Sequence, residues 1–165
     1  MDAKVLLCDF AEVSGGKLFI TGAGISLIAS SSAQAPYPIN LCLAILVEIP
    51  WNETESEHIL TIEMVSEADG SQRRLMLSDQ LPDQADPADR GMIHIVFSAM
   101  RLPTMIDGDE SMMPMSIPLF GLPLPEYGPY FFSVRIDGRE MDRASFRLVP
   151  LPPQQQFPGA GPLEG

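Results

Sequence analysis

Hydrophobic and polar residues alternate along several short stretches of the chain, with a period of two residues. In the run around 60–64, Leu60, Ile62 and Met64 are apolar, and the residues between them are polar. This alternation is typical of β-strands that bury one face. No window shows the spacing of an amphipathic helix, and 16 prolines and 13 glycines interrupt any long helix. The pattern predicts an all-β protein.

Turn-forming residues divide the chain into about eight short stretches that we predict as strands. Glycine next to serine or aspartate marks tight turns at 14–16 and 137–138. Residues 78–90 and 102–114, which contain acids and prolines, are predicted to be exposed loops. The predicted strands are Lys4–Glu12, Lys17–Ile28, Ile39–Ile49, the run around 60–64, 73–77, 92–100, a short edge strand at 115–119, and a final hairpin of 130–136 and 144–148.

Short strands at even spacing predict an antiparallel β-sandwich, immunoglobulin-like in general architecture, with a flattened β-barrel as the alternative. Gly22 and Gly24 interrupt the second predicted strand, which suggests a bulge or a close approach of two backbones. Gly128-Pro129-Tyr130 is similar to a tyrosine corner, in which the tyrosine hydroxyl binds upstream backbone.

The length of 165 residues suits a single domain, which we predict over residues 1–151. Residues 152–165 are rich in proline, glutamine and glycine and are predicted to form a disordered tail. Ten basic residues stand against 22 acidic ones, a net charge of -12. This charge repels phosphate backbones and anionic membrane surfaces, so we expect neither nucleic acid nor a membrane as a partner.

The apolar runs of the sequence are too short for a signal peptide or a membrane-spanning segment. The stretch after Lys4 is shorter than the roughly 7–15 apolar residues of a signal peptide. The longest run, Leu41–Val47, is shorter than the roughly 20 residues that cross a bilayer. We therefore expect a cytoplasmic protein. Cys8 and Cys42 lie in apolar runs outside any metal-binding spacing, and we predict that both are buried packing residues.

The catalytic motifs that we sought are missing from the sequence. Neither His58 nor His94 is accompanied by a serine in a G-x-S-x-G context. His94 alternates with Ile93 and Ile95, so we expect a solvent-facing or locally hydrogen-bonded histidine there. Gly15-Gly16-Lys17 lacks the first glycine of a phosphate-binding loop and the serine or threonine after the lysine. We predict no enzymatic activity and no cofactor.

Methionine is concentrated in one region, since six of the ten lie between Met92 and Met115. Thioether side chains form soft, adaptable contact surfaces. Met112, Met113 and Met115 are therefore candidate interaction residues, with ordinary packing as the alternative. Trp51 is the single tryptophan and lies in a polar loop, where it is either an interaction anchor or a lid on the core edge.

Carboxylates are the candidate metal ligands. Asp107, Asp109 and Glu110 cluster in one predicted loop. Calcium prefers several oxygen ligands from flexible loops, and loops at one end of a sandwich can converge on an ion. This gives an alternative function, a small-ligand or divalent-metal-binding domain that uses acidic end loops.

A combination of three segments resembles a family of small, β-rich bacterial proteins of unknown function, found mainly in actinobacteria. The resemblance covers most of residues 1–149 and implies a cytoplasmic domain without an assigned activity. The segments are 6–12 (LLCDFAE) with the Gly16-Lys17-Leu18 turn and Gly22-Ala23-Gly24, then 47–52 (VEIPWN), and 132–138 (FSVRIDG). Our leading hypothesis is a non-enzymatic β-sandwich that acts through contact with an unknown protein partner or through self-association.

Overall fold

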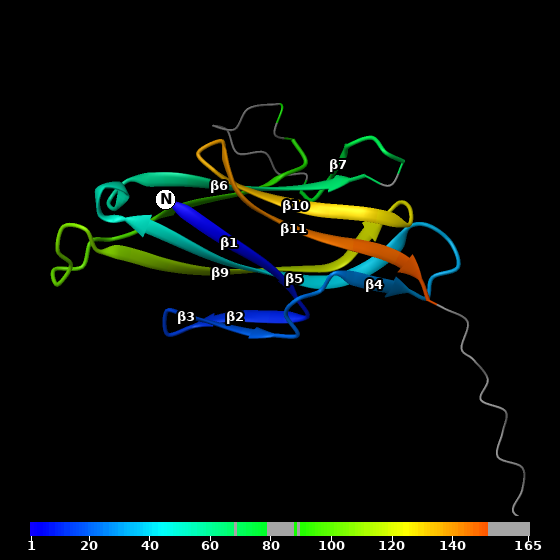
Figure 1. Cartoon of the computed structure of the whole chain (residues 1–165), viewed down its shortest axis with the longest axis horizontal. Coiled ribbons are helices and arrows are strands. Elements are labelled where there is room, and N and C mark those ends of the chain that lie inside the picture. Colours follow the sequence, from blue (N-terminus) through cyan, green and yellow to red (C-terminus); the bar gives the residue numbers. More distant parts are fainter. Residues whose placement is uncertain (68, 79–87, 89, 152–165) are drawn as a thin grey trace, which may run out of the picture.

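The computed structural model describes residues 1–67, 69–78, 88 and 90–151. Within these residues the chain forms eleven β-strands and a short 3-10 helix, η1 (Trp51–Glu53) (Figure 1). The prediction of an all-β protein is confirmed. The strands are β1 (Asp2–Cys8), β2 (Phe10–Ser14), β3 (Lys17–Thr21), β4 (Leu27–Ser30), β5 (Tyr37–Pro50), β6 (Glu57–Ser66), β7 (Arg73–Leu75), β8 (Ile93–Ser98), β9 (Glu110–Leu124), β10 (Gly128–Ile136) and β11 (Arg139–Pro150).

Two sheets face each other across the core, and a hairpin forms a further layer on the outer side of one of them (Figure 1). The first sheet has the order β1-β5-β9, and the second has the order β4-β11-β10-β6-β7, with β8 also paired to β6. β2 and β3 form the hairpin, which lies against the first sheet. The β4–β11 pair is parallel. The other strand pairs of the described chain are antiparallel, so the predicted antiparallel arrangement is confirmed except at this edge, where the long chain between the two strands allows a crossover.

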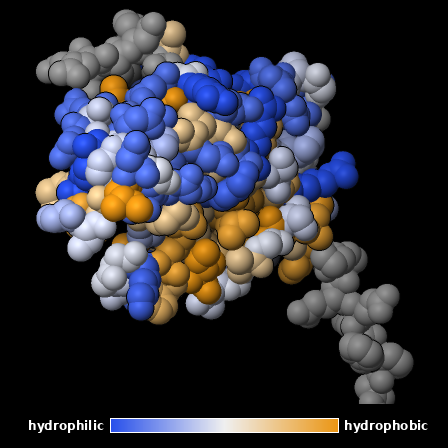
Figure 2. All heavy atoms as spheres, turned by 60° about the vertical axis from the view of Figure 1, so that its left-hand side comes forward, coloured by the Kyte–Doolittle hydropathy of each residue, from blue (hydrophilic) through white to orange (hydrophobic). Residues whose placement is uncertain are grey.

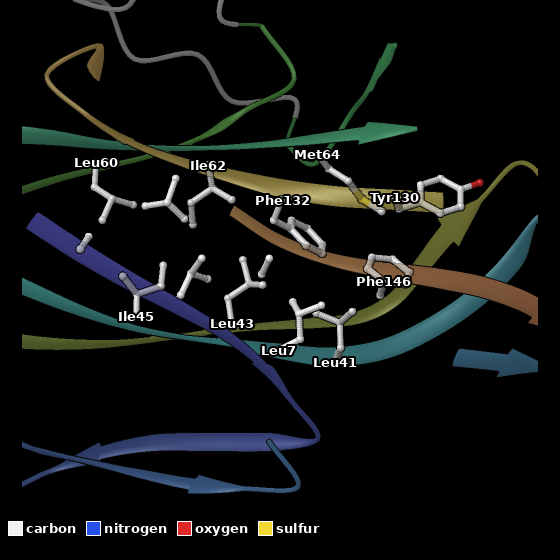
Figure 3. Packing of buried hydrophobic residues seen from close by; sticks show 14 of the residues in the cluster. Leu7, Leu41, Leu43, Ile45, Leu60, Ile62, Met64, Tyr130, Phe132 and Phe146 are labelled. Carbon is white, nitrogen blue, oxygen red and sulfur yellow. The ribbon is translucent and has the colours of Figure 1, made fainter. Parts of the chain in front are cut away.

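The main core lies between the two facing sheets and is built from alternate residues of each strand. In β5 every second residue from Ile39 to Ile49 is buried in this core. Figure 3 shows Leu43 and Ile45 of β5 pointing toward the second sheet, where Ile62 and Phe132 point back at them. The period-two pattern in the sequence is the direct consequence of this one-sided burial.

The other face of β5 is buried as well, but only where the hairpin covers it. Cys42 and Ala44 pack there in a small cluster with Cys8 and Ala11, against the partly buried Leu18 of β3. A strand that is covered on both faces carries a continuous apolar run rather than an alternating one. This explains why the longest apolar run of the chain falls on β5.

The predicted strands Lys4–Glu12 and Lys17–Ile28 are each divided in the structure. β1 ends before Asp9, where the chain turns beneath the first sheet and continues as β2. Gly22 has a φ of +68°, and a Cβ atom added there would lie 2.0 Å from Oδ2 of Asp9. The close neighbour of Gly22 is thus the Asp9 side chain, and Gly22 follows the end of β3 and does not form a bulge within a strand; the predicted close approach of two backbones at this position stays a prediction.

β9 is an edge strand of the first sheet, as predicted, but it is much longer than the expected 115–119. Its 15 residues include part of the predicted loop that precedes this segment. Pro114, at which the predicted loop ended, lies within β9, as do Pro118 and Pro123. Proline is nevertheless compatible with an edge strand when its nitrogen faces away from the neighbouring strand.

Several further predictions have a clear outcome. The final hairpin is confirmed as β10 and β11, joined by Asp137 and Gly138 with φ values of +50° and +79°. The Tyr130 hydroxyl donates to the backbone oxygen of Glu126 at 2.5 Å, as the tyrosine-corner prediction requires. The predicted tail and most of the predicted loop 78–90 lie outside the described residues. Within the described chain, no helix has the length and apolar composition needed to cross a membrane.

Candidate functional site

The hairpin and the outer face of the first sheet expose large apolar side chains. Half of the fourteen exposed large hydrophobic residues of the described chain belong to these elements. Figure 2 shows hydrophobic residues gathered on the lower part of the molecule, whereas its upper part is largely hydrophilic. Exposed apolar patches of this kind often mark contact sites. We call the following set the hairpin surface: Leu6, Phe10, Val13, Phe19, Ile20, Met112 and Phe120.

The hairpin presents apolar side chains on both of its faces. Ala11 and Leu18 point toward the first sheet and pack against it. Phe10 and Phe19 point the other way and are 51% and 53% exposed. A two-stranded hairpin is at best marginally stable alone, so its contact with the sheet holds it in place while its outer face remains open.

Sequence analysis missed the aromatic residues of this surface. The available signal was the unbroken apolar triplet Leu18-Phe19-Ile20, which directly follows a Gly-Gly turn. In a short strand, three consecutive apolar residues make both faces apolar. A hairpin of this composition can cover one face against its own domain and must leave the other exposed.

The outer face of the second sheet has the opposite character. Glu63 is buried there, and its carboxylate accepts hydrogen bonds from Nε of Arg74 at 2.8 Å and pairs with Nη2 of Arg135 at 3.0 Å. The guanidinium of Arg143 lies 4.7 Å from the centre of the Phe131 ring. The ion pairs occupy the middle of this face, and its exposed large apolar side chains, Leu27 and Val96, stand apart on the outer strands β4 and β8.

Trp51 opens η1 and is half-buried. The guanidinium carbon of Arg101 lies 4.0 Å from the centre of the indole ring. Arg101 also donates from Nη2 to the Trp51 backbone oxygen at 2.9 Å and from Nε to Oγ1 of Thr54 at 3.0 Å. The indole is therefore covered by a side chain of its own domain, and its use as an interaction anchor stays a prediction.

The alternation along β9 separates the candidate methionines. Met112 points outward and is 53% exposed, so it belongs to the hairpin surface. Met113 and Met115 point inward and are partly buried against the main core. The structure thus brings one of the three predicted interaction residues to the exposed apolar area, and it places the other two in ordinary packing.

The candidate metal ligands lie before and at the start of β9. Oδ2 of Asp109 accepts a hydrogen bond from the backbone N–H of Ile106 at 2.8 Å, and Asp107 lies in the same turn. Glu110 shares a hydrogen bond with Glu48, which together with their mutual repulsion raises the pKa of Glu48. In the described ranges, no three His, Cys, Asp or Glu side chains are grouped so that they could hold a metal ion. Asp107, Asp109 and Glu110 are therefore not brought together as a ligand set.

His58 is buried, and both of its ring nitrogens have hydrogen-bond partners. Its Nδ1 lies 2.7 Å from Oδ2 of Asp137, and its Nε2 lies 2.9 Å from the backbone oxygen of Glu53. Burial lowers the pKa of His58, but the hydrogen bonds to Asp137 and Glu53 outweigh it, so the pKa is raised. Because both ring nitrogens are engaged, the ring ties β6 to the β10–β11 turn and offers no free base.

A pocket of about 260 Å³ lies at this end of the domain. Glu53 lines this pocket, and its Oε1 accepts a hydrogen bond from the amino group of Met1 at 3.1 Å. The pocket combines charged groups of both signs with apolar side chains, a lining that suits a small charged organic molecule. The lining residues are Met1, Glu53, Ile136, Asp137, Arg139 and Met141.

The two cysteines are buried, as predicted, with 0% and 1% exposure. Cys8 and Cys42 face each other across β1 and β5, and both thiols are free. Burial raises the pKa of Cys8 to about 11. A thiol of this kind holds its proton at neutral pH and is a poor nucleophile, so the pair serves packing beneath the hairpin.

These features define a class of protein: an all-β domain of two facing sheets whose third layer, a hairpin, exposes apolar side chains. Residues 4–149 match a family of unknown function, DUF6941. The chain belongs to this family, which confirms the resemblance to a family of unknown function, while the actinobacterial origin stays a prediction. No curated protein matches the chain.

Proposed function

We propose that this protein is a non-enzymatic interaction domain that binds another protein through the hairpin surface. The observation that carries the proposal is the exposure of Phe10 and Phe19 on the open face of the hairpin. Burying one such side chain completely contributes about 1.5–3 kcal/mol. Two aromatic anchors at the centre of a contact are therefore enough to dominate its binding energy.

The rest of the domain acts as the scaffold in this proposal. The two facing sheets and the tyrosine corner at Tyr130 support an immunoglobulin-like architecture for that scaffold. Domains of this kind commonly use an exposed edge or surface for recognition while the core only supplies stability. We infer that the partner contacts the first sheet and its hairpin, where the exposed apolar side chains are gathered, rather than the second sheet, whose outer face carries the Glu63 ion pairs at its middle.

The test compares capture of partner proteins from a lysate of the source organism by three forms of the full chain. The doubly substituted F10S/F19S should lose a partner that the wild type retains. The control L27S removes an exposed apolar side chain outside the hairpin surface, on β4, and should retain that partner. All three forms are first shown to unfold at similar urea concentrations. Equal capture by the wild type and F10S/F19S would remove the hairpin surface from the interaction.

A second candidate function is small-ligand binding in the pocket beside Asp137. Its support is the mixed charged and apolar lining, to which Arg139 contributes a guanidinium and Glu53 a carboxylate. A thermal-shift screen with amino acids, short carboxylic acids, calcium and magnesium tests this idea, because a ligand of the native state raises Tm by mass action. A shift that R139A abolishes would support the pocket. A shift with calcium that D107N/D109N abolishes would support the loop as a metal site, and no shift at all would argue against both.

A further inference from the structure

Exposed strand edges invite pairing with another chain, and this domain protects some of its edges. At the free side of β1, the N–H of Val5 donates to Oδ2 of Asp142 at 3.0 Å. The carbonyl of Leu7 accepts the N–H of Gly24 at 3.1 Å on the same side. These contacts occupy backbone groups of β1 that another strand would need.

The free edge of β9 is protected by proline. Leu46 and Cys42 of β5 stand opposite Pro114 and Pro118. Proline has no N–H to give to a ladder, so the nitrogens of both must face the open side of β9. A strand that approached from this side would find every second donor missing.

Among the described residues, no proline and no backbone hydrogen bond from outside the hairpin protects the open edge of β3. Gly15 and Gly16 form a two-residue turn with φ values of +56° and +73°, the signature of a type I′ turn. This turn makes Glu12 and Phe19 a hydrogen-bonded pair within the hairpin. The backbone groups of the residues at alternate positions, Leu18 and Ile20 on β3, therefore point to the open edge, as do those of 11 and 13 on β2.

The side chains favour β3 over β2 as the edge that pairs with a second copy. Two β3 strands related by a twofold axis at Phe19 place Leu18 opposite the partner's Ile20 and Phe19 opposite the partner's Phe19. All the central pairs are then apolar, which stabilises adjacent strands. The equivalent pairing of two β2 strands centres on Glu12 and sets two carboxylates directly against each other, which is destabilising.

We propose that the chain forms a homodimer in which two β3 strands pair antiparallel across a twofold axis, giving a four-stranded sheet. The proposal rests on the proposed function, since it names a second copy as the occupant of the hairpin surface. Phe19 and Ile20 lie on opposite faces of β3 and are 53% and 37% exposed. When two β3 strands pair, apolar side chains therefore meet on both faces of the four-stranded sheet. On β1, β4, β8 and β9, by contrast with β3, the exposed large apolar side chains lie on a single face of each strand.

The expected dimer is reversible. The pairing strand has five residues, and a contact of that length falls below the roughly 1,200 Å² typical of stable complexes. Each chain also carries a net charge of -12, which opposes association at low salt. Association should therefore strengthen with protein concentration and with ionic strength up to the physiological range, where surface charges are screened.

The first experiment is sedimentation velocity of the full chain over a hundredfold concentration range at physiological ionic strength. The wild type should shift from monomer to dimer. I20P removes an N–H that points to the open edge of β3, without touching the β2–β3 ladder. It should raise the dissociation constant of the dimer about tenfold or more, because half of the backbone hydrogen bonds across the seam are lost. The matched control V13P removes the equivalent N–H on β2 and should leave the dimer intact.

The second experiment tests the register through charge. F19E and F19K should each be monomeric, because like charges then face each other across the twofold axis, and an equimolar mixture of the two should recover dimer. The recovery separates a real contact from a folding defect. A wild type that is monomeric throughout, a dimer insensitive to I20P, or a mixture that stays monomeric would each overturn the homodimer. The proposed function then stands or fails separately on whether F10S/F19S loses a captured partner.

Discussion

Gly22 is the position at which a single added methyl group most directly tests how the hairpin is attached. The substitution G22A introduces two separate penalties. The φ of +68° lies in the left-handed region, where an alanine costs about 1–2 kcal/mol relative to glycine. The new Cβ also lies 2.0 Å from Oδ2 and 3.1 Å from Cβ of Asp9.

The magnitude of the steric penalty follows from which Asp9 atoms can move. The carboxylate is exposed and can rotate away, but its Cβ is fixed by the backbone at the β1–β2 corner. Overpacking typically costs about 1–3 kcal/mol, and we expect the lower half of this range because the carboxylate can turn. Alanine also restricts the unfolded chain, which returns about 0.4–1 kcal/mol. The net loss expected for G22A is therefore about 2–3 kcal/mol.

The matched control is G16A. Gly16 has a similar φ of +73°, but a Cβ there meets nothing within 4 Å. Its expected loss is therefore the backbone penalty alone, about 1 kcal/mol. Urea unfolding monitored by far-UV circular dichroism and by the fluorescence of Trp51 gives the free energy of unfolding for both variants.

A double-mutant cycle isolates the contact. D9A removes Oδ2 and Cγ, so G22A introduced into D9A should lose about 1 kcal/mol less than G22A alone. If G22A proves no less stable than G16A, or if D9A changes nothing, the close approach between Gly22 and Asp9 does not hold the β1–β2 corner, and the reasoning is refuted.

Three further predictions concern contacts inside the domain. D137N should destabilise the protein by about 1–3 kcal/mol through the lost charged hydrogen bond to His58. Because the pKa of His58 is raised and that of Asp137 is lowered, this loss of stability should be largest between pH 3.8 and 6.5 and should shrink as pH rises through the His58 pKa. Urea midpoints of the wild type and D137N, measured against pH, check this. A difference that stays constant with pH would contradict it. Cys8 and Cys42 should not react with a thiol reagent in the native protein, and both should react in urea, so rapid native labelling would contradict their burial. Y130F should lose about 0.5–1.5 kcal/mol, measured by urea unfolding, because it removes the hydroxyl's hydrogen bond to the Glu126 backbone and leaves the ring in place; an unchanged midpoint would argue against the tyrosine corner.

Local features of the chain were readable from the sequence. The alternation around Ile62 and the Asp137–Gly138 turn depend on neighbouring residues, since strand period and turn conformation are set within a few positions. The all-β class and the final hairpin were predicted correctly for this reason. The tyrosine-corner contact of Tyr130 spans four residues and was also within reach.

Only the tertiary structure decided how these strands combine. His58 is hydrogen-bonded to Asp137, which lies 79 residues away in the sequence, and no local sequence pattern predicts such a contact. β9 extends through its prolines because it occupies an edge, and an edge exists only once the other strands are placed. Met112 is exposed and Met113 is covered because a strand's two faces have different neighbours. The sequence by itself determined an all-β chain with tight turns, since these depend on backbone preference and period. Sheet partners, buried faces and the open hairpin were decided by long-range packing, because the burial of a face depends on which distant strand covers it.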